Sequence, residues 1–136
     1  MRLRKKRCIR YLVKSLIREP IRNVRVEKDW ITFNYDGTTI RNKIVFKKHE
    51  PFVGNWSKKK NEVYIDDDLA GKLDIRALAL HEAVEKFVCQ KYGLSDNKEG
   101  HQVATAKERM FLERIDGKWD KHEKKVEKVW NKEAKS

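Results

Sequence analysis

An amphipathic helix is predicted for residues 74–92, and its apolar face carries a histidine and a carboxylate. On a helical wheel of about 100° per residue, one broad face holds Ala77, Leu78, Leu80, Val84, Phe87, Val88 and Tyr92. His81 and Glu85 fall inside this face, one turn apart, and Glu82 lies at its border. Burying an ionisable side chain lowers the stability of the fold by several kcal/mol unless the group is paired or bound to a metal. A histidine and a glutamate at positions i and i+4 can hold one cation, so His81 and Glu85 are candidate metal ligands.

A second helix, predicted to end at about Ile115, repeats this combination. Its apolar stripe consists of Ala104, Phe111, Leu112 and Ile115. His101 and Glu108 lie within the stripe, two turns apart. The connection from Gly93 to Gly100 is short, so the two helices should pack antiparallel. This packing would bring four candidate metal ligands to one seam: His81, Glu85, His101 and Glu108.

The other periodicities indicate an α+β fold in one domain of 136 residues, enough for a single modest core. Residues 1–20 are predicted to form a basic N-terminal helix. Residues 21–68 are predicted to form a small antiparallel sheet of three to four strands. The helix hairpin that carries the metal site spans residues 74–115, and a C-terminal helix spans residues 118–134.

Alternation of apolar residues locates the strands of this sheet at residues 24–26, 31–35, 40–46 and 63–65. The last of these strands is expected at an edge of the sheet. Residues 47–61, KKHEPFVGNWSKKKN, are predicted to form a polar loop. Asp74 is predicted to cap the helix that follows, and Gly93 to end it.

The segment NEVYIDDDLAGKLDIRALALHEAVEKFV resembles the core of the zincin metallopeptidases. In that superfamily a short edge strand precedes a helix bearing His-Glu-x-x-His, whose glutamate is the general base for a zinc-bound water. The resemblance covers residues 61–113, and it departs from the pattern because Glu85 replaces the second histidine. The downstream segment HQVATAKERMFLERIDGKW also resembles small uncharacterised proteins of phages and mobile elements. These proteins pair His-Glu-x-x-Glu with a His-x-x-Ala-Thr segment.

The resemblance implies one zinc ion, or another divalent metal, per chain. Glu82 would be the catalytic base, and His81 and Glu85 would be two of the ligands. As the third ligand, His101 has the right chemical type, whereas its height along the helix favours Glu108. All four side chains could instead form a closed structural site, or a carboxylate-rich site for two ions.

The charge of the chain suggests a polyanionic partner. Lys and Arg number 33 against 21 Asp and Glu, which gives a formal charge of +12. Nucleic acid is the commonest polyanion, although an abundance of charged residues also accompanies thermal stability. Two basic clusters are candidates for binding its phosphates. They consist of Arg2, Arg4, Lys5, Lys6, Arg7 and Arg10, and of Lys58, Lys59 and Lys60.

Other features bear on the expected compartment. Cys8 and Cys89 lie far apart in the sequence, which favours a reducing cytoplasmic setting over a disulfide framework. No apolar run approaches the length of a membrane span, so no membrane partner is expected. His49 and His122 stand apart from the other candidates and are assigned no role.

The leading interpretation is a zinc-dependent, metallopeptidase-like hydrolase that acts on a peptide or protein substrate. The strand at residues 63–65 would pair with an extended peptide. One alternative is a non-enzymatic nucleic-acid-binding protein in which the metal, or a His-Glu hydrogen-bond network, is structural. Another alternative is a metal-dependent enzyme that is not a peptidase.

Overall fold

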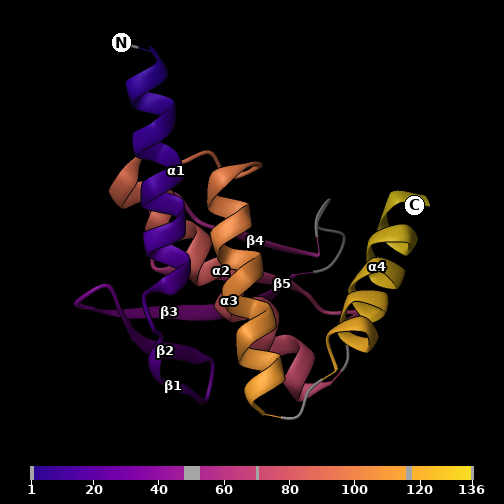
Figure 1. The fold of residues 1–136 in the computed structure, drawn as a ribbon. Helices are drawn as coiled ribbons and strands as arrows, with labels where there is room; N and C mark the ends of the chain where they lie inside the picture. Colours follow the sequence, from indigo (N-terminus) through magenta and orange to yellow (C-terminus); the bar gives the residue numbers. More distant parts are fainter. Residues whose placement is uncertain (1, 48–52, 70, 116–117, 136) are drawn as a thin grey trace.

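The computed structural model describes residues 2–47, 53–69, 71–115 and 118–135, with side chains described between residues 8 and 131 of these ranges. The predicted α+β class is confirmed: an N-terminal helix is followed by a sheet and then by three helices (Figure 1). The elements are α1 (Arg2–Arg18), β1 (Arg22–Glu27), β2 (Trp30–Tyr35), β3 (Thr38–Lys47), β4 (Gly54–Trp56), β5 (Glu62–Asp66), α2 (Lys72–Tyr92), α3 (Glu99–Arg114) and α4 (Trp119–Lys135).

The sheet differs from the predicted one in size and in pairing. It has five strands in the order β1-β2-β3-β5-β4, and β3 and β5 run parallel whereas the other pairs are antiparallel. The additional strand, β4, falls inside the predicted loop at 47–61, where three residues are too few to show an alternating pattern. Because β4 pairs with β5, the expectation that residues 63–65 form a sheet edge is wrong. His49 lies outside the described residues.

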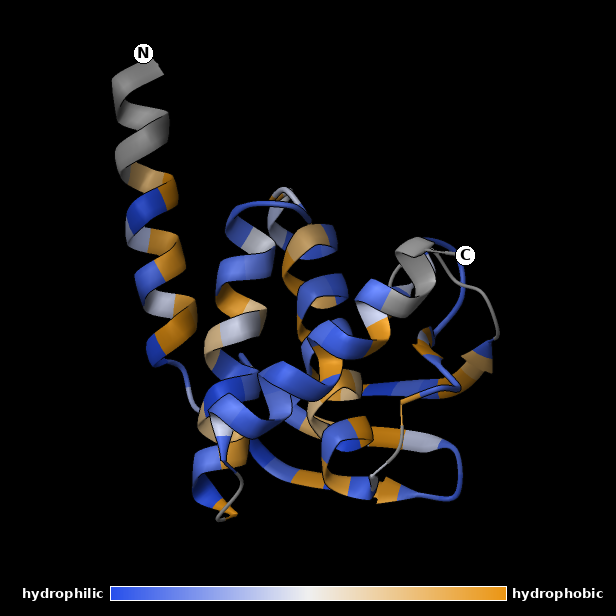
Figure 2. Ribbon diagram, turned by 90° about the vertical axis from the view of Figure 1, so that its right-hand side faces the viewer, coloured by the Kyte–Doolittle hydropathy of each residue, from blue (hydrophilic) through white to orange (hydrophobic). Residues whose placement is uncertain are grey.

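The helix α2 lies at the centre of the molecule. It packs on β2, β3, β4 and β5, while α3 packs on α2 and α1 packs on α3 (Figure 1). Apolar residues alternate with polar ones along the strands (Figure 2), and their buried members meet the small and branched residues of α2. The central contacts include Ile31, Phe33, Val63, Ile65, Ala79, Ala83, Val84 and Val88. Since α2 is covered on two sides, polar side chains beyond its apolar stripe are buried as well.

The ends of α2 agree only partly with the prediction. Gly93 ends the helix in the left-handed conformation, with φ 68°, as expected for a C-terminal glycine. The predicted cap at Asp74 is wrong, because α2 begins two residues earlier, at Lys72, and Gly71 occupies the N-cap position. Asp74 therefore lies in the first turn, where its buried side chain bonds to His122 of α4 instead of to the backbone of α2.

Gly100 allows the start of α3 to approach α2 closely. A Cβ atom at this position would lie 2.4 Å from Cys89 Sγ and 2.9 Å from the carbonyl oxygen of Ser95. Real Cβ atoms do not come this close to other heavy atoms, so only glycine fits here without a shift of the backbone. The contact matters for the site because the next residue, His101, is thereby held beside α2.

We expect Gly100→Ala to lower the free energy of unfolding by about 1–3 kcal/mol, because the added methyl group overpacks a buried contact. Chemical denaturation of the wild type and the variant measures this loss. Adding Cys89→Ala should restore part of the stability, since the sulfur is the nearer of the two obstructing atoms. A Gly100→Ala protein as stable as the wild type would contradict the close approach of α2 and α3.

Candidate metal centre and its cleft

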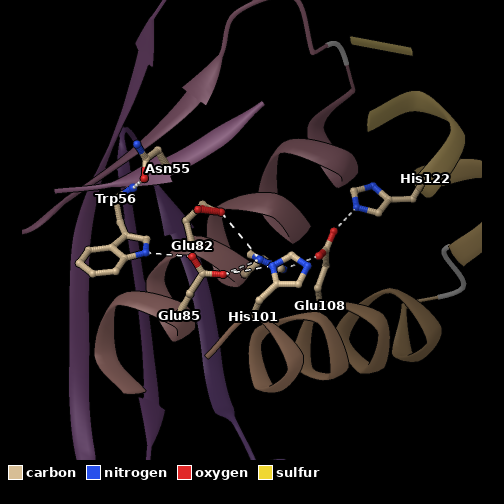
Figure 3. Close-up of polar contacts among 8 residues, drawn as sticks. Asn55, Trp56, Glu82, Glu85, His101, Glu108 and His122 are labelled. Atoms are coloured by element: carbon tan, nitrogen blue, oxygen red, sulfur yellow. Dashed lines mark hydrogen bonds and ion pairs between the residues drawn. The ribbon is translucent and has the colours of Figure 1, made fainter. Parts of the chain in front are cut away.

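The i, i+4 pair predicted on α2 lies in the interior, facing α3. His81 and Glu85 are 5% and 7% exposed, and His81 Nε2 lies 3.2 Å from Glu85 Oε2. A helix brings two side chains with this spacing to the same side, so the contact follows from local geometry alone. Trp56 of β4 adds a further contact, because its indole Nε1 donates a hydrogen bond of 3.0 Å to Glu85 Oε1 (Figure 3).

His101 joins this pair from the first turn of α3. Its Nδ1 atom lies 3.3 Å from Glu85 Oε2, and its ring centroid lies 4.9 Å from that of His81. One donor atom from each of His81, Glu85 and His101 falls within 4.8 Å of the other two. Two imidazoles and one carboxylate form a common ligand set of catalytic zinc. The His101 side chain is 59% exposed, so the group opens towards solvent on its side.

Glu108 occupies a different position around His81. Its Oε1 atom lies 2.7 Å from His81 Nδ1, whereas the Nε2 atom of the same ring faces Glu85. Metal-binding histidines commonly donate their second ring N–H to a carboxylate, which fixes the orientation of the ring. Between the two candidates for the third ligand, the geometry favours His101, and it gives Glu108 the orienting position.

His122, which the sequence analysis left without a role, extends this arrangement into α4. It is 2% exposed, its Nδ1 atom lies 2.8 Å from Asp74 Oδ1, and its Nε2 atom contacts Glu108 Oε2 (Figure 3). Lys125 Nζ donates a 2.9 Å bond to the other oxygen of Asp74. A continuous polar chain thus links His81 on α2 through Glu108 on α3 to α4. A signal was present in the sequence, because His122 lies on an apolar stripe just as His81 does.

Electrostatic interactions within the group oppose the effect of burial. Burial lowers the pKa of His81, but hydrogen bonds to Glu108 and Glu85 outweigh it and raise the pKa to about 10. Burial raises the pKa of Glu85, yet hydrogen bonds from His101 and His81 bring it down to about 2. Without a cation, His81 therefore carries a proton between two carboxylates. A divalent metal that bound to His81 would displace this proton and supply positive charge in its place.

Glu82 faces the same space without joining the hydrogen-bond network. It is 5% exposed, and its Oε2 atom lies 3.9 Å from His81 Nε2 (Figure 3). Its carboxyl group abuts Gly54 of β4, where an added Cβ would lie 3.1 Å from Glu82 Cδ. Burial raises the pKa of Glu82 to about 8. A carboxyl group with a pKa near neutral pH is suited to accepting and returning a proton during a reaction.

These side chains form the floor of a cleft of about 840 Å³. Its walls come from β4, the connection between α2 and α3, α3 itself and α4. Trp119, Val126 and Trp130 contribute the apolar surface of the α4 wall. The volume falls in the range of ligand-binding pockets, so a side chain or a short peptide segment has room beside the polar group.

The four predicted phosphate-binding residues whose side chains are described do not line this cleft. Lys58, Lys59 and Lys60 are exposed between β4 and β5, and Arg10 is exposed on α1. The remaining five, Arg2, Arg4, Lys5, Lys6 and Arg7, belong to α1, and their side chains lie outside the described part of the chain. The contacts of the described four do not identify a partner.

Comparisons of the chain with protein-family models, with curated proteins and with solved structures found no match. Among the helices of the described ranges, none is both long enough and apolar enough to cross a membrane.

Proposed function

We propose that the protein is a zinc-dependent hydrolase that cleaves peptide bonds. The observation that carries this proposal is the meeting of three donor side chains, His81, Glu85 and His101, within 4.8 Å of one another on the floor of a cleft. Two imidazoles and a carboxylate match the ligand preferences of zinc, and the exposed side of His101 leaves room for a substrate.

In this proposal each side chain has a separate task. His81, Glu85 and His101 would hold the metal, which when bound supplies a Lewis acid that polarises a carbonyl group and makes water more acidic. Glu82, buried beside His81, would accept the proton of the attacking water and pass it to the leaving amine. Glu108 would keep His81 in the orientation and tautomer that leave Nε2 free for the metal.

The edge strand β4 makes a peptide the favoured substrate. Among the described strands it pairs with β5 alone and lies at the end of the sheet. Gly54 of this strand lies close to the carboxyl group of Glu82, since an added Cβ would be 3.1 Å from Glu82 Cδ. An extended peptide that added to the other edge of β4 by backbone hydrogen bonds would pass directly in front of Glu82. In this proposal the strand that pairs with an extended peptide is residues 54–56, and not residues 63–65 as expected from the sequence.

A second candidate function is non-enzymatic nucleic-acid binding, with the buried histidines serving only the fold. One observation favours it: His81 and His122 each have carboxylates at both ring nitrogens, so the network is satisfied without an ion. The formal charge of +12 supplies the attraction to phosphates. Salt-sensitive DNA or RNA binding that survives both chelation and Glu82→Gln, in a protein without metal, would support this candidate.

Metal content tests the leading proposal most directly. Protein purified without added metal or chelator should contain about one zinc ion per chain, and His81→Ala should contain none, because the variant loses a central ligand. Elemental analysis by mass spectrometry gives both values. Glu127→Gln is a matched control, since it removes an exposed carboxylate from the same cleft and should keep the zinc. No metal in the wild type, with or without supplementation, would overturn the proposal.

A further inference from the structure

The cleft has a charge opposite to that of the chain as a whole. Lys and Arg make up 33 of the 136 residues, yet neither type occurs in the cleft lining within the described ranges. The lining instead contains six acidic side chains: Glu82, Glu85, Asp96, Glu108, Glu123 and Glu127. A cleft lined by one sign of charge concentrates ligands of the opposite sign, because its protein walls confine the field.

The carboxylates fall into an inner and an outer group. Glu85 and Glu108 are inner residues whose charges are matched by histidines. The outer residues Asp96, Glu123 and Glu127 are exposed, and none of them has an ion pair with another described residue. They come from two different walls, the connection between α2 and α3 and the helix α4. The outer cleft therefore carries carboxylates on both sides that have no ion-pair partner among the described residues.

Two further features of the cleft point to the shape of a suitable ligand. Glu82 is 5% exposed and lines the cleft, and among the described residues its one close charged neighbour is His81, 3.9 Å away, so its carboxyl group has no hydrogen-bond donor from the described residues. Trp119, Val126 and Trp130 provide an apolar wall next to Glu123 and Glu127. Lysine and arginine combine an apolar stem with a charged head, and indole rings attract such heads.

We propose that the cleft selects peptide segments that carry a lysine or arginine side chain close to the bond that is cleaved. The stem of this side chain packs along α4, and its head lies among Asp96, Glu123 and Glu127. The inference rests on the proposed function, because the same cleft contains the proposed metal site. It adds the substrate class: basic segments, which the net positive charge of the chain repels and the carboxylates of the cleft attract.

Matched peptides test this selection in binding and in hydrolysis. One pair of fluorescent peptides differs only in lysine or norleucine, and a second pair differs only in arginine or citrulline. The neutral member of each pair keeps the stem of the side chain and lacks its charge. Anisotropy titration of Glu82→Gln protein should show about tenfold tighter binding of the charged member at low salt, with the difference falling as salt rises. The triple variant Asp96→Asn, Glu123→Gln, Glu127→Gln should reduce the difference to about twofold or less. Glu113→Gln, an exposed carboxylate outside the cleft, should leave it unchanged.

The outcomes separate this inference from the proposed function. Zinc content and peptide hydrolysis with equal use of charged and neutral peptides would overturn the selection and leave the proposed function standing. Charge-selective binding by a protein without zinc or hydrolysis would overturn the proposed function and keep the cleft as a site for basic segments. Spermidine carries the same alkylammonium groups without a peptide backbone. If it binds more tightly than the lysine peptide, the assignment to peptides is overturned.

Discussion

Replacing Glu82 by glutamine should lower peptide hydrolysis by about 10²–10⁴-fold while leaving the zinc content at the wild-type value. Glutamine has nearly the shape of glutamate but cannot accept the proton of an attacking water. The metal-binding side chains His81, Glu85 and His101 are unaltered by the change, so metal affinity should persist. Turnover of a basic peptide, measured beside elemental analysis of the same preparation, gives both quantities. Undiminished turnover in the variant would remove Glu82 from the reaction.

The same variant distinguishes loss of chemistry from loss of folding. Burial raises the pKa of Glu82 from an ordinary 4.5 to about 8. Between these pH values the folded protein keeps a proton that the unfolded chain has released, so this group makes stability fall as pH rises through that window. Glu82→Gln should abolish the part of this pH-dependent loss of stability that is due to Glu82. The variant should therefore melt at a higher temperature than the wild type near pH 8. Calorimetry of chelator-treated protein measures this, and a lower melting temperature would indicate a damaged fold.

Replacing Glu108 by alanine should weaken zinc binding by about 10–100-fold and lower the free energy of unfolding by about 3–5 kcal/mol. The carboxylate contacts His81 Nδ1 and His122 Nε2, so its removal leaves two buried histidines each short of a partner. Competition with a zinc chelator gives the affinity, and urea denaturation gives the stability.

Glu113→Ala is the matched control for this change, because Glu113 is an exposed carboxylate on the same helix whose ion pair among the described residues is with Arg109. It should alter stability by less than about 0.5 kcal/mol and leave zinc affinity unchanged. The double variant Glu108→Ala, His122→Ala should lose less stability than the sum of the two single changes, since both break the same contact. Strictly additive losses would contradict the chain from α2 to α4.

The differences between the predicted and the observed fold have identifiable causes. The helices were predictable because a period of 3.6 residues persists over many turns in α2, α3 and α4. The strand β4 was not, because Gly54–Trp56 is too short for any period and forms only by pairing with β5. The parallel pairing of β3 with β5 was also not predictable, because it depends on the path of the chain between the two strands and not on any local sequence pattern.

By itself, the sequence determined the features that depend on near neighbours. His81 and Glu85 share one side of a helix wherever that helix packs, and Gly93 ends it because of its own backbone freedom. The tertiary structure decided what depends on how helices rotate and approach. Contact at Gly100 holds His101 beside Glu85 and leaves Glu108 at the other nitrogen of His81. Packing of α4 then completes the network with His122, a partner 14 residues from Glu108 and 48 from Asp74. Such contacts arise only when distant elements bury their surfaces together, so spacing along the chain cannot encode them locally.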